Sequence, residues 1–137
     1  LGVGPSFAIA AKLLRPEQRV LLIAGDGAFG LNGMEIETAV RFGLPMTVVI
    51  GNDGGWGQIR NPQLSFFGAE RAVATSLPFT RYDRMVEALG GKGIHVTEPR
   101  QLRPALERAL DSSEVYVINV VLDPAAYRRT GQVSMAI

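Results

Sequence analysis

The chain has 137 residues, of which 47% are hydrophobic and 20% charged, with a formal net charge of +1, as in an ordinary globular protein. The balanced charge gives no electrostatic basis for binding nucleic acid or an acidic membrane surface, and the lack of cysteine excludes disulfides and thiolate chemistry. No stretch approaches the ~20 consecutive apolar residues of a membrane span and no secretory signal is recognisable, so we expect one cytoplasmic domain over 1–137.

Apolar patterning and turn residues divide the chain into alternating helices and strands. Pro5 suits the first turn of a helix, Pro16 and Gly43 suit helix ends, and continuous apolar runs are typical of buried strands. We predict helices over 5–14, 34–42, 82–89 and 101–110, and strands over 20–24, 46–50, 93–96 and 115–122. We expect 51–80 to be loop with no more than a short helical turn, and 123–137 to be an irregular C-terminal tail.

This order of elements predicts an α/β fold of three layers, with a mainly parallel sheet between two layers of helices. In such sheets, ligands bind at the carboxyl ends of the strands. Two acidic residues occupy these positions, because Asp26 follows the first predicted strand and Asp53 follows the second. We therefore expect the two carboxylates to converge on one ligand although they are distant in sequence.

The run Gly25-Asp26-Gly27-Ala28-Phe29-Gly30 forms a glycine-rich turn directly after the first predicted strand. Such a turn lets the backbone approach a diphosphate, and it also fits the fingerprint of nicotinamide and flavin dinucleotide enzymes. Dinucleotide-binding enzymes carry an acidic residue about 20 positions after the glycine-rich turn. In this chain Asp53 comes later than that and precedes a Gly-Gly-Trp-Gly loop. A carboxylate beside a diphosphate needs a cation between them, and Mg²⁺ binds through one or two carboxylates plus phosphates. The pattern favours a magnesium diphosphate site, with a dinucleotide-dependent oxidoreductase as an alternative.

The segment GDGAFGLNGMEIETAVRFGLPMTVVIGND, residues 25–53, resembles the thiamine diphosphate motif of the decarboxylase and carboligase superfamily, which begins with GDG and ends in one or two asparagines. The similarity covers nearly the whole chain, since 1–4 resemble the loop under the aminopyrimidine ring and 115–123 the last strand of the diphosphate-binding domain. Within the superfamily, GNDGGWGQIRNPQ and residues 127–133 are most similar to acetolactate synthase-like proteins and 2-hydroxyacyl-CoA lyases. The resemblance implies the thiamine diphosphate-binding fold and an enzyme that cleaves or forms C–C bonds next to a carbonyl.

The resemblance also implies which residues bind the cofactor. These are Leu1, Gly25, Asp26, Gly27, Ala28, Asn52, Asp53, Gly55 and Trp56. Mg²⁺ is expected to be held by Asp26, Asp53 and the backbone carbonyl of Gly55, and the N–H groups of Gly27 and Ala28 to meet the diphosphate. Leu1 takes the place of the apolar side chain that bends the cofactor.

One position departs from the family. Many relatives have asparagine where this chain has Asp53, and a register change would bring the preceding Asn52 into the metal site instead. Because aspartate also binds magnesium and the spacing suits it, we expect Asp53 to be the ligand and Asn52 to support it.

Several other residues have both structural and functional interpretations. Trp56 either caps the apolar core or lines the substrate pocket, and the sequence leaves both open. His95 has no recognisable partner and is interpreted as structural. The resemblance suggests that the C-terminal segment folds over the site, where Arg128 and Arg129 would approach the phosphates of a coenzyme A substrate. As ordinary tail charges they would have no such role.

The resemblance finally implies partners that this sequence does not contain. In the family, a glutamate on a pyrimidine-binding domain of the same or a neighbouring subunit activates the cofactor, so we assign no catalytic residue here. The opening Leu1-Gly2-Val3-Gly4-Pro5 has no initiator methionine, and we expect a fragment of a longer chain that is inactive alone. The complete protein is expected to be a homodimer or homotetramer acting on a small carbonyl or acyl-CoA substrate. A non-catalytic cofactor-binding subunit is the alternative.

Overall fold

The computed structural model describes residues 1–126, so Arg128, Arg129 and the rest of the predicted tail from 127 lie outside the described residues. The helices are α1 (Gly4–Leu14), α2 (Asp26–Gly30), α3 (Glu35–Arg41), α4 (Gly57–Phe67), η1 (Ala69–Arg71), α5 (Tyr82–Ala88) and α6 (Pro99–Leu110). The strands are β1 (Leu21–Gly25), β2 (Thr47–Asn52), β3 (Lys92–Val96) and β4 (Tyr116–Val121). None of the described helices has the length and apolar character needed to cross a membrane.

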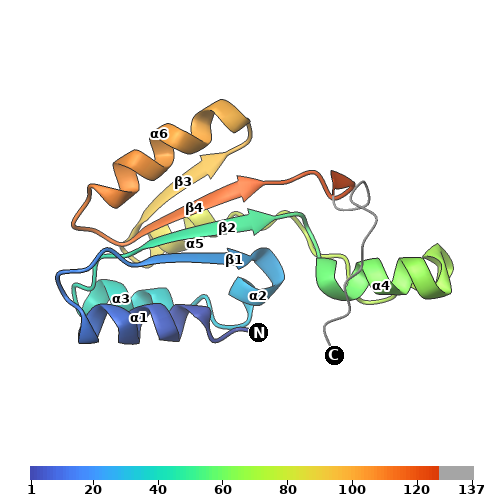
Figure 1. Ribbon diagram of the computed structural model, residues 1–137, viewed down its shortest axis with the longest axis horizontal. Coiled ribbons are helices and arrows are strands. Elements are labelled where there is room, and N and C mark those ends of the chain that lie inside the picture. The colour runs from blue at the N-terminus through green and yellow to red at the C-terminus, as the bar shows by residue number, and fades with distance from the viewer. Residues whose placement is uncertain (127–137) are drawn as a thin grey trace.

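The four strands form one sheet in the order β1-β2-β4-β3, and every neighbouring pair is parallel (Figure 1). Strands of a parallel sheet are typically covered on both faces, and continuous apolar runs suit that environment. The register pairs Gly25 with Gly51 and Asn52 with Val121, so β1, β2 and β4 end at the same edge. The predicted α/β fold with a mainly parallel sheet is confirmed.

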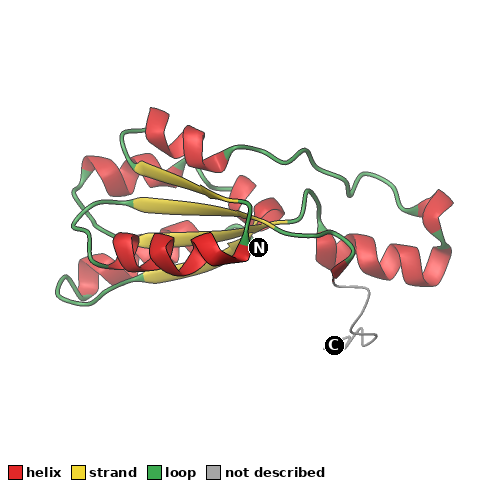
Figure 2. Ribbon diagram, turned by 90° about the horizontal axis from the view of Figure 1, so that it is seen from above, coloured by secondary structure: helices red, strands yellow, loops and turns green. Residues whose placement is uncertain are grey.

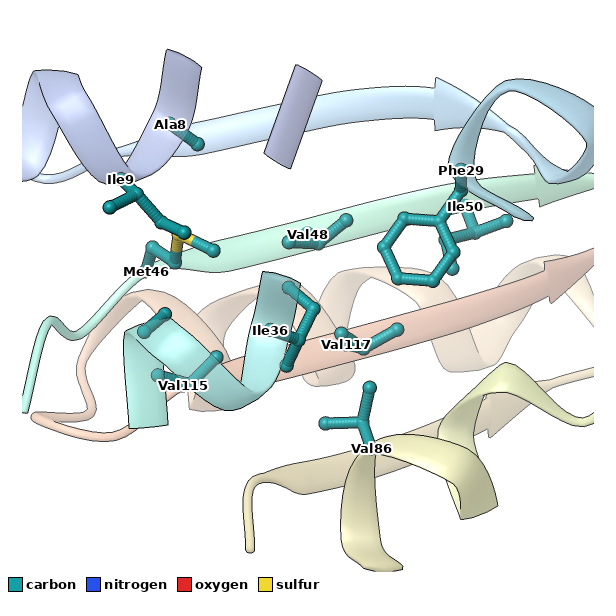
Figure 3. Close-up of a cluster of buried hydrophobic side chains, with 11 residues drawn as sticks. Ala8, Ile9, Phe29, Ile36, Met46, Val48, Ile50, Val86, Val115 and Val117 are labelled. Carbon is teal, nitrogen blue, oxygen red and sulfur yellow. The ribbon is translucent and has the colours of Figure 1, made fainter. Parts of the chain in front are cut away.

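The larger part of the core lies on one face of the sheet, under α1, α2, α3 and α5 (Figure 3). Phe29, Ile36 and Val86 from three of these helices are completely buried against Val48 and Val117 of the strands. Burial of one such side chain contributes about 1.5–3 kcal/mol to folding. This cluster holds α2, and with it the turn after β1, firmly against the sheet.

Among residues 1–126, the other face is covered by α6, whose Ala105 and Ala109 pack with Tyr116 and Ile118 of β4. A capping box between Glu98 and Gln101 begins this helix. The predicted three layers are therefore present, but the second helical layer covers β3 and β4 and leaves part of β1 open. Ile23 on β1 is accordingly 74% exposed.

The region 51–80 differs from the expected loop, because it contains the eleven-residue helix α4. This helix extends away from the sheet, as Figures 1 and 2 show. None of its residues is buried and Pro62 lies inside it, so neither apolar periodicity nor helix propensity marks it in the sequence. The turn after β1 also differs, since Asp26 begins the short helix α2. The other predicted elements agree with the structure within two residues at each end.

Candidate metal and phosphate site

A cleft of about 490 Å³ opens at the edge where β1 and β2 end. Its walls come from residues 1–5, from the turn after β1, from the loop after β2 and from the beginning of α4. Eight of the nine residues expected to bind the cofactor line it, namely Leu1, Gly25, Asp26, Gly27, Ala28, Asp53, Gly55 and Trp56. The ninth, Asn52, is completely buried and is not part of the lining.

Asp26 links the two loops that carry the carboxylates. The residue is 2% exposed, and its Oδ2 accepts a hydrogen bond from the N–H of Gly55 at 3.1 Å. Burial raises the pKa of Asp26 above its usual value and repulsion from Asp53 adds to the rise, while hydrogen bonds from the backbone of Gly27 and Gly55 oppose it. A divalent cation beside the two carboxylates would remove this repulsion, which makes the pair suitable for a metal.

The loop after β2, residues 53–56, has a backbone shaped for this contact. Gly54 has φ +64°, in the left-handed region that favours glycine. The N–H of Trp56 donates to the carbonyl of Thr75 at 2.9 Å, which ties the loop to the segment after η1. The N–H of Gly55 is used by Asp26, whereas no hydrogen bond from residues 1–126 reaches the Gly55 carbonyl. That carbonyl oxygen suits a hard cation such as Mg²⁺.

The indole of Trp56 packs over Gly27. A Cβ at position 27 would lie 2.9 Å from Cε3 of the ring, so only glycine leaves room for it. Trp56 lines the cleft and belongs to neither of the two buried clusters. Of its two interpretations, the geometry therefore supports a place in the wall of the site.

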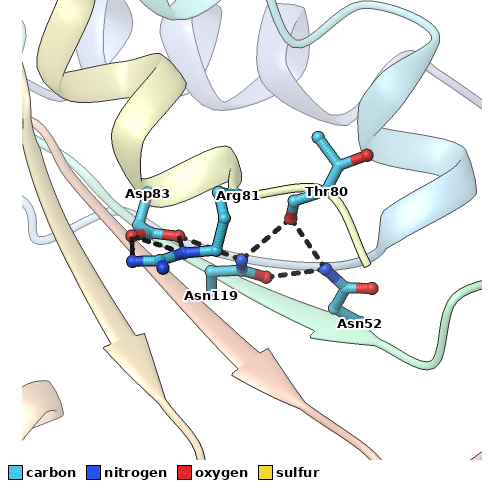
Figure 4. Close-up of polar contacts among 5 residues, drawn as sticks. All are labelled: Asn52, Thr80, Arg81, Asp83 and Asn119. Atoms are coloured by element: carbon cyan, nitrogen blue, oxygen red, sulfur yellow. Dashed lines mark hydrogen bonds and ion pairs between the residues drawn. The ribbon is translucent and has the colours of Figure 1, made fainter. Parts of the chain in front are cut away.

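Asn52 and Asp53 have different environments, and this bears on which of them binds a metal. The Nδ2 of Asn52 donates to the carbonyl of Thr80 at 3.0 Å and to Oδ1 of Asn119 at 3.1 Å (Figure 4). Its Oδ1 accepts the N–H of Gly54 at 3.3 Å. The Asn52 amide is thus engaged beneath the loop, and Asp53 is the one of the two residues that lines the cleft.

The structure also reveals residues near the site that the sequence did not single out. Tyr82 donates from Oη to the backbone carbonyl of Asp26 at 3.2 Å, and Asp83 and Asn119 are buried below the two loops. Asn119 carried a usable signal, because a lone amide inside an apolar strand requires a hydrogen-bond partner. Nothing local marks Tyr82. Gln58 and Asn61 line the cleft from α4 and were missed together with that helix.

Fold and site together define a class of α/β protein in which a ligand binds at the ends of parallel strands, beside paired carboxylates. Within residues 1–126, no three His, Cys, Asp or Glu side chains gather into a metal cage. A cation here would need further oxygen ligands from the backbone and from the bound molecule, as Mg²⁺ at a phosphate does.

The chain belongs to the thiamine pyrophosphate enzymes, because residues 1–120 match the family described as "Thiamine pyrophosphate enzyme, C-terminal TPP binding domain". It is 51% identical over 130 residues to a probable acetolactate synthase of Mycobacterium bovis, 40% over 134 to an oxalyl-CoA decarboxylase of Escherichia coli, and 36% over 136 to a 2-hydroxyacyl-CoA lyase of Oryza sativa. These alignments cover 94%, 98% and 96% of this chain but 24%, 23% and 24% of the relatives. The chain thus spans about a quarter of their length.

A solved structure has the same fold. The thiamine diphosphate-dependent 4-hydroxybenzoylformate decarboxylase of Rhodococcus jostii RHA1 superposes with a TM-score of 0.83 at 24% sequence identity, covering 90% of this chain and 23% of that one. The predicted family, the fold and the thiamine diphosphate cofactor are confirmed, and the alternative of a nicotinamide or flavin dinucleotide domain is not favoured.

Proposed function

We propose that this domain binds the magnesium and diphosphate end of thiamine diphosphate in an enzyme that cleaves or forms C–C bonds next to a carbonyl. The observation that supports this best is that Asp26, Asp53 and Gly55 line one cleft, with the N–H of Gly55 bonded to the Asp26 carboxylate. The two carboxylates and the Gly55 carbonyl would hold Mg²⁺, and the N–H groups of Gly27 and Ala28 would meet the diphosphate. The proposed activity is that of a lyase or carboligase, either acetolactate synthase-like or acting on 2-hydroxyacyl-CoA.

The cofactor supplies, when bound, a carbon nucleophile that adds to the substrate carbonyl and accepts the charge left by C–C cleavage. The residues of this chain hold and orient it. The N–H of Gly55 fixes the Asp26 carboxylate, and the Trp56 ring against Gly27 closes one wall of the cleft. Binding and positioning of this kind place the reactive atoms close together, which removes much of the entropic cost of the reaction.

The rim of the cleft supports a second domain as partner. Leu1, Ile23 and Leu122 line the cleft and are 73%, 74% and 44% exposed, so an apolar rim faces outward. Within the described lining, the titratable side chains are Asp26 and Asp53, which the proposed metal would engage. We therefore propose that a pyrimidine-binding domain of the same or a neighbouring subunit, in a homodimer or homotetramer, covers this rim and brings the activating glutamate.

Isothermal titration calorimetry tests the proposed site. Thiamine diphosphate should bind to the protein in the presence of Mg²⁺ and weakly or not at all without it, and NAD should bind in neither condition. Asp26→Ala should abolish the effect of Mg²⁺ while lowering the free energy of unfolding by at most about 1–2 kcal/mol. The matched control is Asp111→Ala, which removes a carboxylate that is 72% exposed and paired with Arg19. Metal-independent binding of NAD would contradict the proposal.

A further inference from the structure

A four-residue segment, residues 80–83, contacts both the turn after β1 and the end of β2, which carry the two carboxylates of the proposed site. It lies immediately before and at the start of α5. Its Tyr82 donates a hydrogen bond from Oη to the carbonyl of Asp26 at 3.2 Å. Its Thr80 carbonyl accepts one from Asn52 and one from Asn119, both at 3.0 Å (Figure 4). This one segment therefore connects the turn after β1, through the Tyr82 side chain, to the end of β2, through the Thr80 carbonyl.

The hydrogen bonds under the loop after β2 have a fixed direction, and Asp83 sets it. An ionised carboxylate only accepts, so Asn119 must present its Nδ2 to Asp83, at 3.1 Å. The Oδ1 of Asn119 is then left to accept from Nδ2 of Asn52, at 3.1 Å. Asn52 in turn directs its own Oδ1 to the N–H of Gly54, at 3.3 Å. The donor and acceptor roles are thus set along a series of hydrogen bonds that begins at Asp83 and ends at the backbone N–H of Gly54, between Asp53 and Gly55.

Asp83 is itself held in place by a charged partner. Nη2 and Nε of Arg81 donate to its two carboxylate oxygens at 2.6 and 2.9 Å. The Asp83 side chain is 5% exposed, whereas that of Arg81 is 41% exposed. The ion pair therefore closes the network on its solvent side and keeps the buried carboxylate ionised and oriented.

Tyr82 explains the last glycine of the Gly25–Gly30 run. A Cβ at Gly30 would lie 2.8 Å from the Tyr82 hydroxyl oxygen, so a side chain there would displace that hydroxyl from Asp26. The Tyr82 ring also packs edge-on against Phe29, with ring centroids 5.2 Å apart. The hydroxyl is thus placed by packing of the ring and by the absence of a side chain at position 30.

We infer that Tyr82 and Asp83 are positioning residues that set the distance and orientation between the Asp26 turn and the Asp53 loop for the bound cation. This inference rests on the proposed function, because it assigns a role toward the same Mg²⁺ site. Mg²⁺ demands nearly ideal octahedral geometry, whereas Ca²⁺ accepts irregular sets of oxygen ligands. Loss of positioning should therefore weaken the binding of Mg²⁺ more than the binding of Ca²⁺. General destabilisation of the fold would not produce that difference.

The test measures the apparent dissociation constants of Mg²⁺ and Ca²⁺ by calorimetry at one fixed excess of thiamine diphosphate, for the unmodified protein and for Tyr82→Phe and Asp83→Ala. Tyr82→Phe keeps the ring and removes only the hydroxyl. Its Mg²⁺ affinity should fall roughly 10- to 100-fold, as for other groups that orient metal ligands, with a smaller fall for Ca²⁺. Tyr116→Phe is the matched control, because it removes the hydroxyl of a buried tyrosine in the α6 cluster, away from both loops. Its affinities should not change.

Thermal unfolding of each variant establishes that it folds. If Asp83→Ala does not fold, the result for Tyr82→Phe alone decides the inference. Unchanged Mg²⁺ affinity in Tyr82→Phe, or an equal fall for Mg²⁺ and Ca²⁺, would overturn the inference. Failure of the unmodified protein to bind thiamine diphosphate with either cation is a different result. It would overturn the proposed function and this inference with it.

Discussion

Replacing Gly27 with alanine probes how closely the two loops of the site are packed. A Cβ at position 27 would lie 2.9 Å from Cε3 and 3.0 Å from Cδ2 of Trp56, about 0.5 Å inside ordinary van der Waals contact. The indole is rigid and the backbone N–H of Trp56 is bonded to the Thr75 carbonyl at 2.9 Å, so relief of the contact requires a change of the Trp56 side-chain rotamer or movement of loop 53–56. Overpacking of this kind costs about 1–3 kcal/mol of the free energy of unfolding.

Gly25→Ala is the matched control for this change, since it adds the same methyl group to the same turn. A Cβ there meets nothing within 4 Å, and the backbone at φ −77° and ψ 157° suits alanine. The free energy of unfolding should stay the same or rise by about 0.4–1 kcal/mol. Denaturant unfolding followed by the fluorescence of Trp56, the one tryptophan of the chain, measures both variants. Equal stabilities for Gly27→Ala and Gly25→Ala would refute the packing argument.

The buried network around Asp83 leads to two further predictions. Burial raises the pKa of Asp83, but hydrogen bonds from Arg81 and Asn119 outweigh it and hold that pKa below its usual value. The carboxylate therefore stabilises the fold above the unfolded pKa of about 3.9, and this contribution disappears as pH falls through the lower folded pKa. Asp83→Asn should accordingly lose more stability at pH 7 than at pH 3 in denaturant titrations, and an equal loss at both would count against this. Asn119→Ala leaves Asn52 and Asp83 short of buried partners and should cost about 1–3 kcal/mol at pH 7, against no measurable loss for the exposed control Ser113→Ala. Equal stabilities of these two variants would show that the network contributes nothing.

The order of helices and strands was predictable because it depends on local patterns. Apolar runs such as 46–50 match buried strands, and Gly43 ends the helix before it with φ +60°. Helix α4 was not predictable in this way, because it buries none of its residues and contains Pro62. Gln58 and Asn61 were therefore missing from the predicted site, although they line its cleft.

The sequence by itself determined the family, the α/β order and the placement of Asp26 and Asp53 at the ends of strands, because motif and apolar patterning are properties of neighbouring residues. The tertiary structure alone decided that Asn52 is engaged beneath the loop while Asp53 lines the cleft, and that Tyr82 supports the turn at Asp26. These contacts join residues 67 and 56 positions apart. Their hydrogen-bond partners depend on how distant segments approach one another in space, which no local pattern records.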